Sequence, residues 1–422
     1  MRSNYRRIGD FIHLVDERNS DLQVTLLLGL SISKEFIPSV ANTVGTNMAK
    51  YKIIRKSQFA CSIMQVRRDK KMPVALLKDY DEAIISQAYP VFEVKNPEEL
   101  MPEYLMMWMS RSEFDREACF LAVGGVRGSL EWEDFLEMKL PIPPIEKQRA
   151  IVQEYNTIVN RIKLNEEINQ KLEETAQAIY KHWFVDFEFP ISKEYTEAVG
   201  KPELEGKPYK SSGGEMEYND SLEKEVPKNW EVKPFTEVVS LKGGGTPSTN
   251  IQIYWNGNIP FFTPKDIAKS YYTTKTIKTL TPEGLANCSS KLFEKDTIFI
   301  TARGTVGETS LASREMAMNQ SCYAIVPNEK INPYFAHQLA KHVLNTLKNE
   351  AIGAVFKALV TRDFESKMVA EPHREILLGF GNALKPIYDK ILILSQQSEK
   401  LKELIDLILA RMTMLENEHI VT

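Results

Sequence analysis

Apolar positions recur at alternating steps of four and three along two long stretches of the chain. The first stretch contains Ile151, Tyr155, Ile158, Ile162, Asn165, Asn169, Leu172, Ala176, Ile179 and Trp183. The second contains Phe380, Leu384, Ile387, Ile391, Leu394, Ser398, Leu401, Ile405, Ile408 and Met412. This alternation keeps one stripe of a helix facing a partner helix. The pattern predicts long helices over residues 145–185 and 374–422, each about 60 Å long at 1.5 Å per residue.

The two stretches belong to an internal repeat. Every position of the second lies 229 residues after its counterpart in the first, and the same offset pairs Asp134 with Asp363 and Pro143 with Pro372. A register kept without a gap indicates two copies of one architecture. The simplest way to bury two matched seams is to pack them together as an antiparallel pair. The alternative is that each helix packs on its own domain.

Polar residues interrupt both seams near the middle, at Asn165, Asn169 and Ser398. A buried polar pair at such positions typically fixes helix register at some cost in stability. We therefore predict a helix–helix interface along the seams. Its expected members are Ile158, Ile162, Asn165, Leu172, Ile179, Ile387, Ile391, Leu394, Leu401 and Ile408.

The sequence before each helix has a different character. Residues 1–144 and 228–373 contain short runs of β-branched and aromatic residues punctuated by Gly, Pro, Asn and Asp, which predict β-rich domains with a few helices. Residues 186–227 are rich in Pro, Ser and Gly and predict a linker. The expected fold class is α+β, with two β-rich domains separated by two long antiparallel helices that form a coiled coil with an internal pseudo-twofold repeat.

The charge of the chain is nearly balanced. It has 53 Lys and Arg residues against 57 Asp and Glu residues, a formal net charge of −4. That sum argues at first against a nucleic-acid partner, because phosphate-binding surfaces are usually basic. The charges are segregated, however. Residues 186–227 carry 11 acidic and five basic residues, which leaves a net charge of +2 for the rest of the chain.

A basic cluster occupies residues 50–71, where eight Lys and Arg residues are accompanied by Asp69 alone. Such a concentration creates a local positive field that attracts a polyanion. A solvated loop with scattered lysines is the alternative. The candidate polyanion-binding residues of the first domain are Lys34, Lys50, Lys52, Arg67, Arg68, Lys70 and Lys71.

Two glycine-containing segments of the second domain are also candidates. Residues 243–248 can bring main-chain amides close to a ligand, although no Lys-Ser or Lys-Thr pair follows as in a nucleotide-binding loop. Arg303 stands on a Gly-flanked turn, from which it can contact a phosphate or a guanine edge; a plain hairpin turn is the alternative. The predicted residues are Lys242, Gly245, Thr246, Ser248, Lys265, Lys269 and Arg303.

Catalytic patterns are missing from the sequence. The six His and four Cys residues show no metal-site spacing, and there is no Gly-x-Ser-x-Gly motif or adenine-methylase Pro-Pro-aromatic tetrapeptide. We therefore predict a binding protein without a catalytic centre or metal site. The polar, Arg-rich N-terminus and the absence of an apolar run of about 20 residues predict a cytoplasmic protein with no membrane segment.

Several local motifs lie at the junctions between these parts. They are Leu140-Pro141-Ile142-Pro143-Pro144 with Glu146-Lys147-Gln148-Arg149, then Trp183-Phe184-Val185-Asp186-Phe187, Pro227 with Trp230, Gly244 to Ser248, and Gly29 to Ser39. In these motifs and in the order of its parts, the whole chain resembles the DNA-specificity subunits of type I restriction-modification enzymes. The second junction, Ala370 to Glu375, departs from the multi-proline form of the first.

The resemblance implies that residues 1–144 and 228–373 are target recognition domains, each reading half of a bipartite sequence in double-stranded DNA. It implies that the helices space the half-sites about one to two duplex turns apart. Two methyltransferase (modification) subunits would dock on the helices, with restriction (translocase/nuclease) subunits outside them. S-adenosylmethionine, ATP and Mg²⁺ are then expected on partner subunits and none on this chain. A coiled-coil scaffold without a nucleic-acid role is the alternative function.

Overall fold

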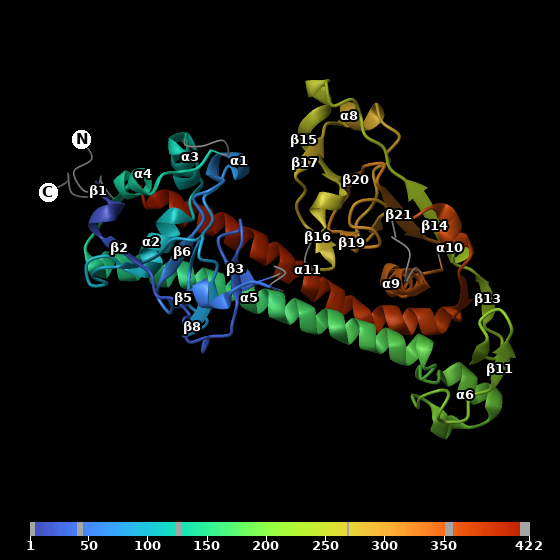
Figure 1. Ribbon diagram of the computed structural model, residues 1–422. Coiled ribbons are helices and arrows are strands. Elements are labelled where there is room, and N and C mark those ends of the chain that lie inside the picture. Colours follow the sequence, from blue (N-terminus) through green and yellow to red (C-terminus); the bar gives the residue numbers. More distant parts are fainter. Residues whose placement is uncertain are drawn as a thin grey trace. The chain divides into compact units, whose positions relative to one another are not determined.

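The computed structural model describes residues 5–39, 45–123, 128–267, 270–328, 330–350 and 358–413 (Figure 1). The chain divides into two compact units. Unit 1 is Met1–Arg161 with Leu401–Thr422, and unit 2 is Ile162–Lys400. The two long helices, α5 (Ile145–Tyr180) and α11 (Arg374–Arg411), contribute to both units. Each unit thus combines one β-rich domain with part of each helix, whereas the sequence predicted domains and helices as separate segments.

The two long helices run antiparallel within unit 2. Asn165 Nδ2 donates a hydrogen bond to Ser398 Oγ at 3.2 Å, and Asn169 Nδ2 donates to Ser395 Oγ at 3.2 Å. In the turn that directly follows α5, the ring of Trp183 meets Phe380, with ring centroids 5.6 Å apart. Residues later in α5 therefore contact residues earlier in α11. The polar seam residues meet each other across this contact.

The predicted seam positions are covered to different degrees. Ile158, Asn165, Ile391, Leu394 and Ile408 are buried, whereas Ile162, Leu172, Ile179, Ile387 and Leu401 are half-buried. A π-helical turn, Lys181–Val185, ends the first long helix. Among the residues that the structure describes, no helix has the length and apolar character needed to cross a membrane.

Unit 1 contains a four-stranded sheet in the order β2-β9-β6-β7 and the strand pairs β1–β10, β3–β4 and β5–β8. Its core includes Phe59 stacked on Phe92, with ring centroids 4.9 Å apart. The strands are β1 (Tyr5–Arg7), β2 (Ile12–Val15), β3 (Leu28–Leu30), β4 (Phe36–Pro38), β5 (Lys52–Arg55), β6 (Phe59–Cys61), β7 (Val74–Leu76), β8 (Glu82–Ile85), β9 (Val91–Val94) and β10 (Lys139–Pro141). The helices are η1 (Ile8–Asp10), η2 (Met48–Lys50), α1 (Val66–Asp69), α2 (Pro102–Met109), α3 (Ser112–Leu121) and α4 (Trp132–Glu137).

Unit 2 contains a five-stranded sheet in the order β14-β21-β18-β19-β16 and a three-stranded sheet in the order β17-β15-β20. The strands are β11 (Met216–Asn219), β12 (Lys224–Pro227), β13 (Glu231–Pro234), β14 (Val239–Gly243), β15 (Trp255–Phe262), β16 (Tyr272–Thr273), β17 (Lys278–Leu280), β18 (Ile298–Thr301), β19 (Thr309–Ala312), β20 (Ala317–Met318), β21 (Cys322–Pro327) and β22 (Met368–Glu371). The helices are α6 (Lys193–Val199), η4 (Pro202–Leu204), α7 (Phe235–Val238), η5 (Gln252–Tyr254), η6 (Pro264–Asp266), α8 (Pro282–Ala286), α9 (Pro333–Glu350) and α10 (Thr361–Glu365).

The same closing strand pair occurs in both β-rich domains. In unit 1, β1 pairs antiparallel with β10, which directly precedes α5. In unit 2, β13 pairs antiparallel with β22, which directly precedes α11. The first strand of each β-rich domain therefore lies beside the last strand of the same domain.

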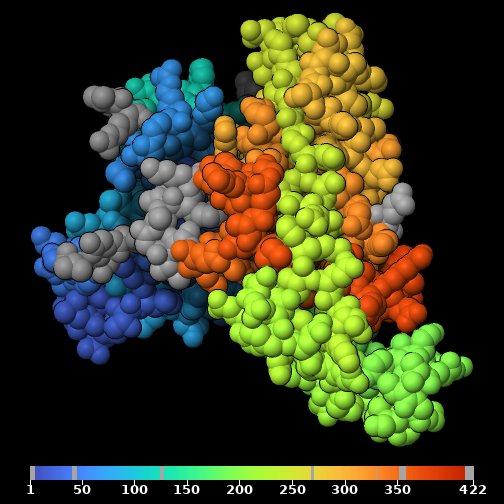
Figure 2. All heavy atoms as spheres, turned by 90° about the vertical axis from the view of Figure 1, so that its right-hand side faces the viewer, coloured from blue at the N-terminus to red at the C-terminus, as the bar shows by residue number. Residues whose placement is uncertain are grey.

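Residues 186–227 are folded, which corrects the prediction of a linker. They contain α6 and the β11–β12 hairpin, and in Figure 2 the green residues near 200 form a lobe at one end of unit 2. Phe189 stacks between Tyr209 and Trp230, with centroid distances of 4.6 and 5.3 Å. The Pro and Gly residues mark turns, while buried aromatic side chains supply a core that the composition did not reveal.

Candidate nucleic-acid interface

Four cations of the predicted basic cluster lie on α1 and the residues after it. Arg67, Arg68, Lys70 and Lys71 are all exposed. Arg68 Nε lies 2.7 Å from Asp69 Oδ1, whereas the described part of the chain offers no ion-pair partner to the other three. Lys70 caps the helix in the left-handed conformation, with φ of +52°. We refer to residues 67–71 as the basic loop.

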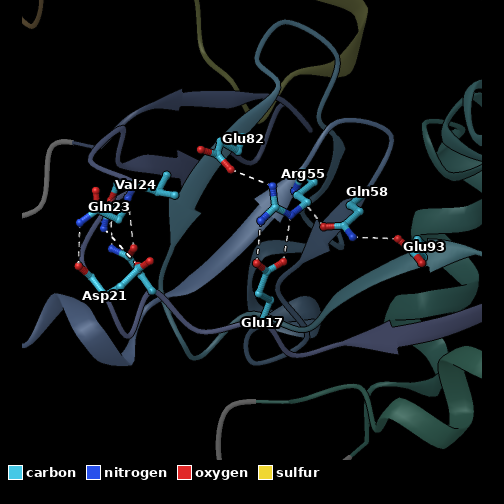
Figure 3. Close-up of polar contacts among 9 residues, drawn as sticks. Glu17, Asp21, Gln23, Val24, Arg55, Gln58, Glu82 and Glu93 are labelled. Carbon is cyan, nitrogen blue, oxygen red and sulfur yellow. Dashed lines mark hydrogen bonds and ion pairs between the residues drawn. The ribbon is translucent and has the colours of Figure 1, made fainter.

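The cations on β5 are neutralised by acidic residues. Arg55 lies between Glu17 and Glu82, at 2.6 and 2.8 Å, as Figure 3 shows. The hydrogen-bonded Glu17 carboxylate raises the pKa of Arg55 above its usual value. Strand pairing explains the arrangement, because Arg55 on β5 lies directly opposite Glu82 on β8. Within the predicted basic cluster of residues 50–71, the charge of Arg55 is therefore neutralised.

The neighbours of Arg55 follow the same pattern in part. Lys52 Nζ lies 3.4 Å from Asp16, and Lys56 Nζ lies 3.8 Å from Asp81. Lys50, at the end of η2, is exposed. Acidic residues that are distant in sequence thus pair with the cations of residues 52–56. Among the described residues of the predicted cluster, Lys50 and the basic loop keep cations without an ion-pair partner.

Lys34 is an interior residue, which corrects its prediction as a DNA contact. Its side chain is only 7% exposed, and Nζ lies 2.8 Å from Asp115 Oδ1 and donates a hydrogen bond to the Met109 carbonyl. The Met72 amide also donates to Asp115 Oδ1, at 3.1 Å. Burial lowers the pKa of Lys34, and the Asp115 carboxylate opposes that effect. Lys34 and Asp115 together support the chain immediately after the basic loop.

In unit 2, the loops that follow β14, β15, β18 and β20 meet at one edge of the sheets. Thr246 Oγ1 donates a hydrogen bond to Gln320 Oε1, and the Asn319 amide donates to the Phe262 carbonyl at 3.0 Å. The Ala302 amide donates to the Ser321 carbonyl at 2.8 Å. These bonds bring together segments that are far apart in the sequence. We refer to Thr246, Lys265, Arg303 and Gln320 as the recognition edge.

The recognition edge carries exposed polar and cationic groups. Thr246, Lys265, Arg303 and Gln320 are all exposed, as are Ser248 and, on β14, Lys242. Within the described residues, no ion pair involves the side chain of Lys242, Lys265 or Arg303. Lys269 lies outside the described residues. This edge can therefore present both cations and hydrogen-bonding side chains to a ligand.

The glycines before Thr246 serve internal packing, which corrects the prediction for Gly245. A Cβ atom on Gly244 would lie 2.2 Å from the Asn319 carbonyl oxygen, and one on Gly245 would lie 2.1 Å from Ser289 Oγ. The Gly245 amide already donates to the Met318 carbonyl at 3.1 Å. Because the amide is used inside the protein, Gly245 lets the chain pack closely and leaves Thr246 to face outward.

Sequence reasoning missed three residues of these surfaces. Asp115 and Gln320 lie in stretches without any distinguishing pattern. Ile277 is an exposed apolar residue between Lys275 and Lys278, and an isolated apolar residue in a basic stretch is a signal that could have identified it.

These features define a class of protein. Its members contain two β-rich domains, each with exposed cations on its loops and each followed by a long helix. Comparisons with known proteins then identify the family.

The sequence matches the family described as "Type I restriction modification DNA specificity domain" over residues 33–174 and 227–403. The type I restriction enzyme HindI specificity subunit of Haemophilus influenzae is 26% identical over 374 residues, covering 79% of this chain and 81% of that protein. The MjaIX specificity subunit of Methanocaldococcus jannaschii is 28% identical over 194 residues, covering 45% of each protein. The crystal structure of a type I restriction-modification S subunit from M. genitalium matches with a TM-score of 0.55 at 13% identity, covering 97% of this chain and 95% of that one.

The chain belongs to the type I restriction-modification DNA specificity family, as its junction motifs predicted. It is a DNA-specificity subunit of such a system and not itself the enzyme. The structural match supports the mixed helix and strand fold.

Proposed function

We propose that this subunit reads a bipartite target in double-stranded DNA, one half-site with each β-rich domain. The observation that carries the proposal is that both family-matched regions contain a β-rich domain with exposed cations and continue into a long helix. The 229-residue repeat and the antiparallel contact of Asn165 with Ser398 support a coiled coil with pseudo-twofold symmetry. Two related domains on such a scaffold suit two half-sites.

The two domains would contact DNA through different groups. In the first domain, the basic loop suits contact with phosphates, which positions a protein on the duplex without reading its sequence. In the second domain, Lys265 and Arg303 supply charge, and Thr246 and Gln320 supply hydrogen-bonding groups for base edges. Base discrimination in the second half-site would therefore depend on the recognition edge.

The helices would dock two methyltransferase subunits. Support comes from large apolar side chains that the α5–α11 contact leaves uncovered. On α11, Leu378, Ile393, Leu404 and Leu407 are between 41 and 61% exposed, and Leu164 on α5 is 44% exposed. The outer face of a paired helix is normally polar, so these residues suit a further helical partner.

Restriction subunits would join this assembly outside the methyltransferase subunits. S-adenosylmethionine, ATP and Mg²⁺ are proposed to bind those partners and not this chain. The cytoplasm, where cellular DNA is accessible to such a complex, is the proposed location.

The test is a selection from randomised duplexes with the complex of this chain and its modification subunits. We expect two short constant half-sites separated by an unread spacer of fixed length, and an affinity that falls as salt is added. A single continuous motif would contradict the bipartite reading. An affinity for DNA that depended neither on sequence nor on salt concentration would favour a scaffold without a nucleic-acid role.

A further inference from the structure

Ile277 is the observation from which the inference starts. It lies between β16 and β17 and is 72% exposed. Single exposed apolar residues are common on protein surfaces, so exposure alone assigns no role. Ile277 differs because a buried carboxylate holds its backbone amide and because its segment adjoins exposed cations of the recognition edge.

The backbone amide of Ile277 is held by the buried Asp266 side chain. Its amide donates to Asp266 Oδ1 at 2.7 Å, and Asp266 also accepts from the amide and the hydroxyl of Thr263, at 2.8 and 2.6 Å. The preceding residue, Thr276, donates through Oγ1 to the Lys278 carbonyl at 2.7 Å. An exposed aliphatic side chain on a fixed backbone loses little conformational freedom when it binds a ligand.

Ile277 adjoins the recognition edge. Its partner Asp266 follows Lys265 directly in η6. Pro264, in the same short helix, lies close to Gly304: a Cβ atom added to Gly304 would lie 3.7 Å from the Pro264 Cβ. Gly304 is the neighbour of Arg303. The segment that carries Ile277 therefore adjoins η6, which carries the exposed Lys265 and approaches the turn that carries the exposed Arg303.

The chemistry of Ile277 and of the neighbouring cations indicates which ligand this surface would bind. Exposed cations attract phosphates, so they would hold a duplex against this edge. An isoleucine side chain cannot form hydrogen bonds, and the base feature that an aliphatic group recognises in the major groove is the 5-methyl group of thymine. We infer that Ile277 is a specificity-determining residue that contacts a thymine methyl group in the second half-site. The inference rests on the proposed function.

Replacement of thymine by uracil tests the inference, because it removes only the methyl group. The experiment uses the complex with modification subunits and a duplex obtained by selection. Each thymine of the second half-site is replaced in turn. The wild-type complex should bind about fourfold more weakly at one of these positions, the effect of losing one buried methyl-sized group. The Ile277→Ala variant should bind the thymine and uracil duplexes equally.

Ile253→Ala is the matched control. Ile253 is 60% exposed in η5, which precedes β15, whereas η6 follows that strand. This variant should keep the fourfold difference between thymine and uracil. Circular dichroism melting should show that both variants fold, as expected for exposed side chains.

Two results would overturn the inference. One is that no thymine replacement weakens wild-type binding; the other is that Ile277→Ala keeps the difference. The second result is also what we would expect if the Ile277 side chain unstacked bases and did not contact a methyl group. In either case the complex would still select two half-sites with salt-dependent affinity. Loss of that selection in the wild type would instead contradict the proposed function.

Discussion

Asp115 is a single residue on which two interactions of the first domain depend. Its carboxylate accepts from the buried Lys34 ammonium and from the Met72 amide. Removing it would leave the buried Lys34 charge without a counter-ion and the Met72 amide without its acceptor. The loss of a partner from a buried ion pair typically costs about 3–5 kcal/mol of stability.

We therefore expect Asp115→Ala to lower the free energy of unfolding by about 3–5 kcal/mol, measured by urea denaturation of the full chain. Arg116→Ala is the control, because Arg116 is an exposed neighbour on α3 and should change stability by less than about 0.5 kcal/mol. Equal urea midpoints for Asp115→Ala and the wild type would show that the pair does not stabilise the domain.

The basic loop and Arg55 provide a second comparison at the residue scale. Replacing Arg67, Lys70 and Lys71 by Ala should weaken binding to all duplexes and reduce the slope of log affinity against log salt by about one for each lost phosphate contact. The slope is measured by fluorescence anisotropy with the complex.

Arg55→Ala is the matched control for this triple replacement. Because Glu17 and Glu82 neutralise Arg55, its removal should leave the salt slope unchanged. If Arg55→Ala lowered the slope as much as the basic-loop replacements, the division of the cluster into a neutralised and a free part would be wrong.

The cations of the first domain show how much the sequence can predict about single residues. The concentration of charge near residues 50–71 was visible, and the exposed Arg67, Lys70 and Lys71 lie within it. The neutralisation of Arg55 was not visible, because Glu82 comes opposite it only when β5 pairs with β8. The burial of Lys34 likewise depends on α3, which brings Asp115 to it.

At the scale of elements, Tyr271 joins helix α5 to the second domain within unit 2. The Glu173 side chain accepts from the Tyr271 amide at 2.8 Å, and the Glu173 carbonyl accepts from the Tyr271 hydroxyl at 3.1 Å. Gln338 on α9 donates to the same hydroxyl at 3.2 Å. Burial raises the pKa of Glu173 from 4.5 to about 7. We therefore expect the contact between α5 and this domain to be sensitive to pH.

The direction follows from the raised pKa. Below about pH 4.5 the carboxyl group is protonated in both the folded and the unfolded state, whereas between about pH 4.5 and 7 the folded state holds the proton more tightly. The contribution of Glu173 to the free energy of unfolding therefore decreases as pH rises through that window, by at most about 3 kcal/mol. Urea denaturation at pH 5 and pH 8 measures the difference.

Glu173→Gln should remove this part of the pH dependence, since glutamine stays neutral. Glu174→Gln is the control on the exposed side of the same helix turn and should retain it. Identical pH dependence in the wild type and Glu173→Gln would show that Glu173 does not titrate in this range.

Elements differ in how far their sequence predicts them. The heptad period predicted both long helices and placed Asn165 in the seam of the first and Ser398 in the seam of the second, because an interface between helices repeats along the chain. The folded lobe of residues 186–227 has no such period. Its core depends on Phe189, Tyr209 and Trp230, which meet only after several turns bring them together.

At the scale of the whole molecule, helix length is proposed to set the distance between half-sites. Deleting one heptad from α5 and one from α11 preserves the seam pattern and removes about 10 Å of helix. We expect the unread spacer to shorten by about three base pairs, since a duplex turn of about 34 Å holds about ten. Selection from duplexes with a randomised spacer measures its length.

Deleting the heptad from α11 alone is the control, because it breaks the pairing of Asn165 with Ser398 without shortening both helices. That variant should bind weakly with no new preferred spacer. An unchanged spacer in the double deletion would mean that something other than helix length determines it.

At the scale of the whole molecule, the structure also shows where the charges behind the net charge of −4 lie. The acidic residues 186–227 fold as a lobe of unit 2, whereas the free cations lie on the basic loop and the recognition edge. Within the described residues these two surfaces present only a few cations, so part of the affinity for DNA is expected to come from partner subunits.

The closing strand pairs have a consequence for evolution and engineering. Because β1 pairs with β10 and β13 with β22, the two ends of each β-rich domain are fastened side by side before the next helix begins. Such a domain can be exchanged as a cassette, with cuts at these strands, while the helices keep their length and seam. New specificities can therefore arise by recombination of whole modules rather than by gradual change at each base contact.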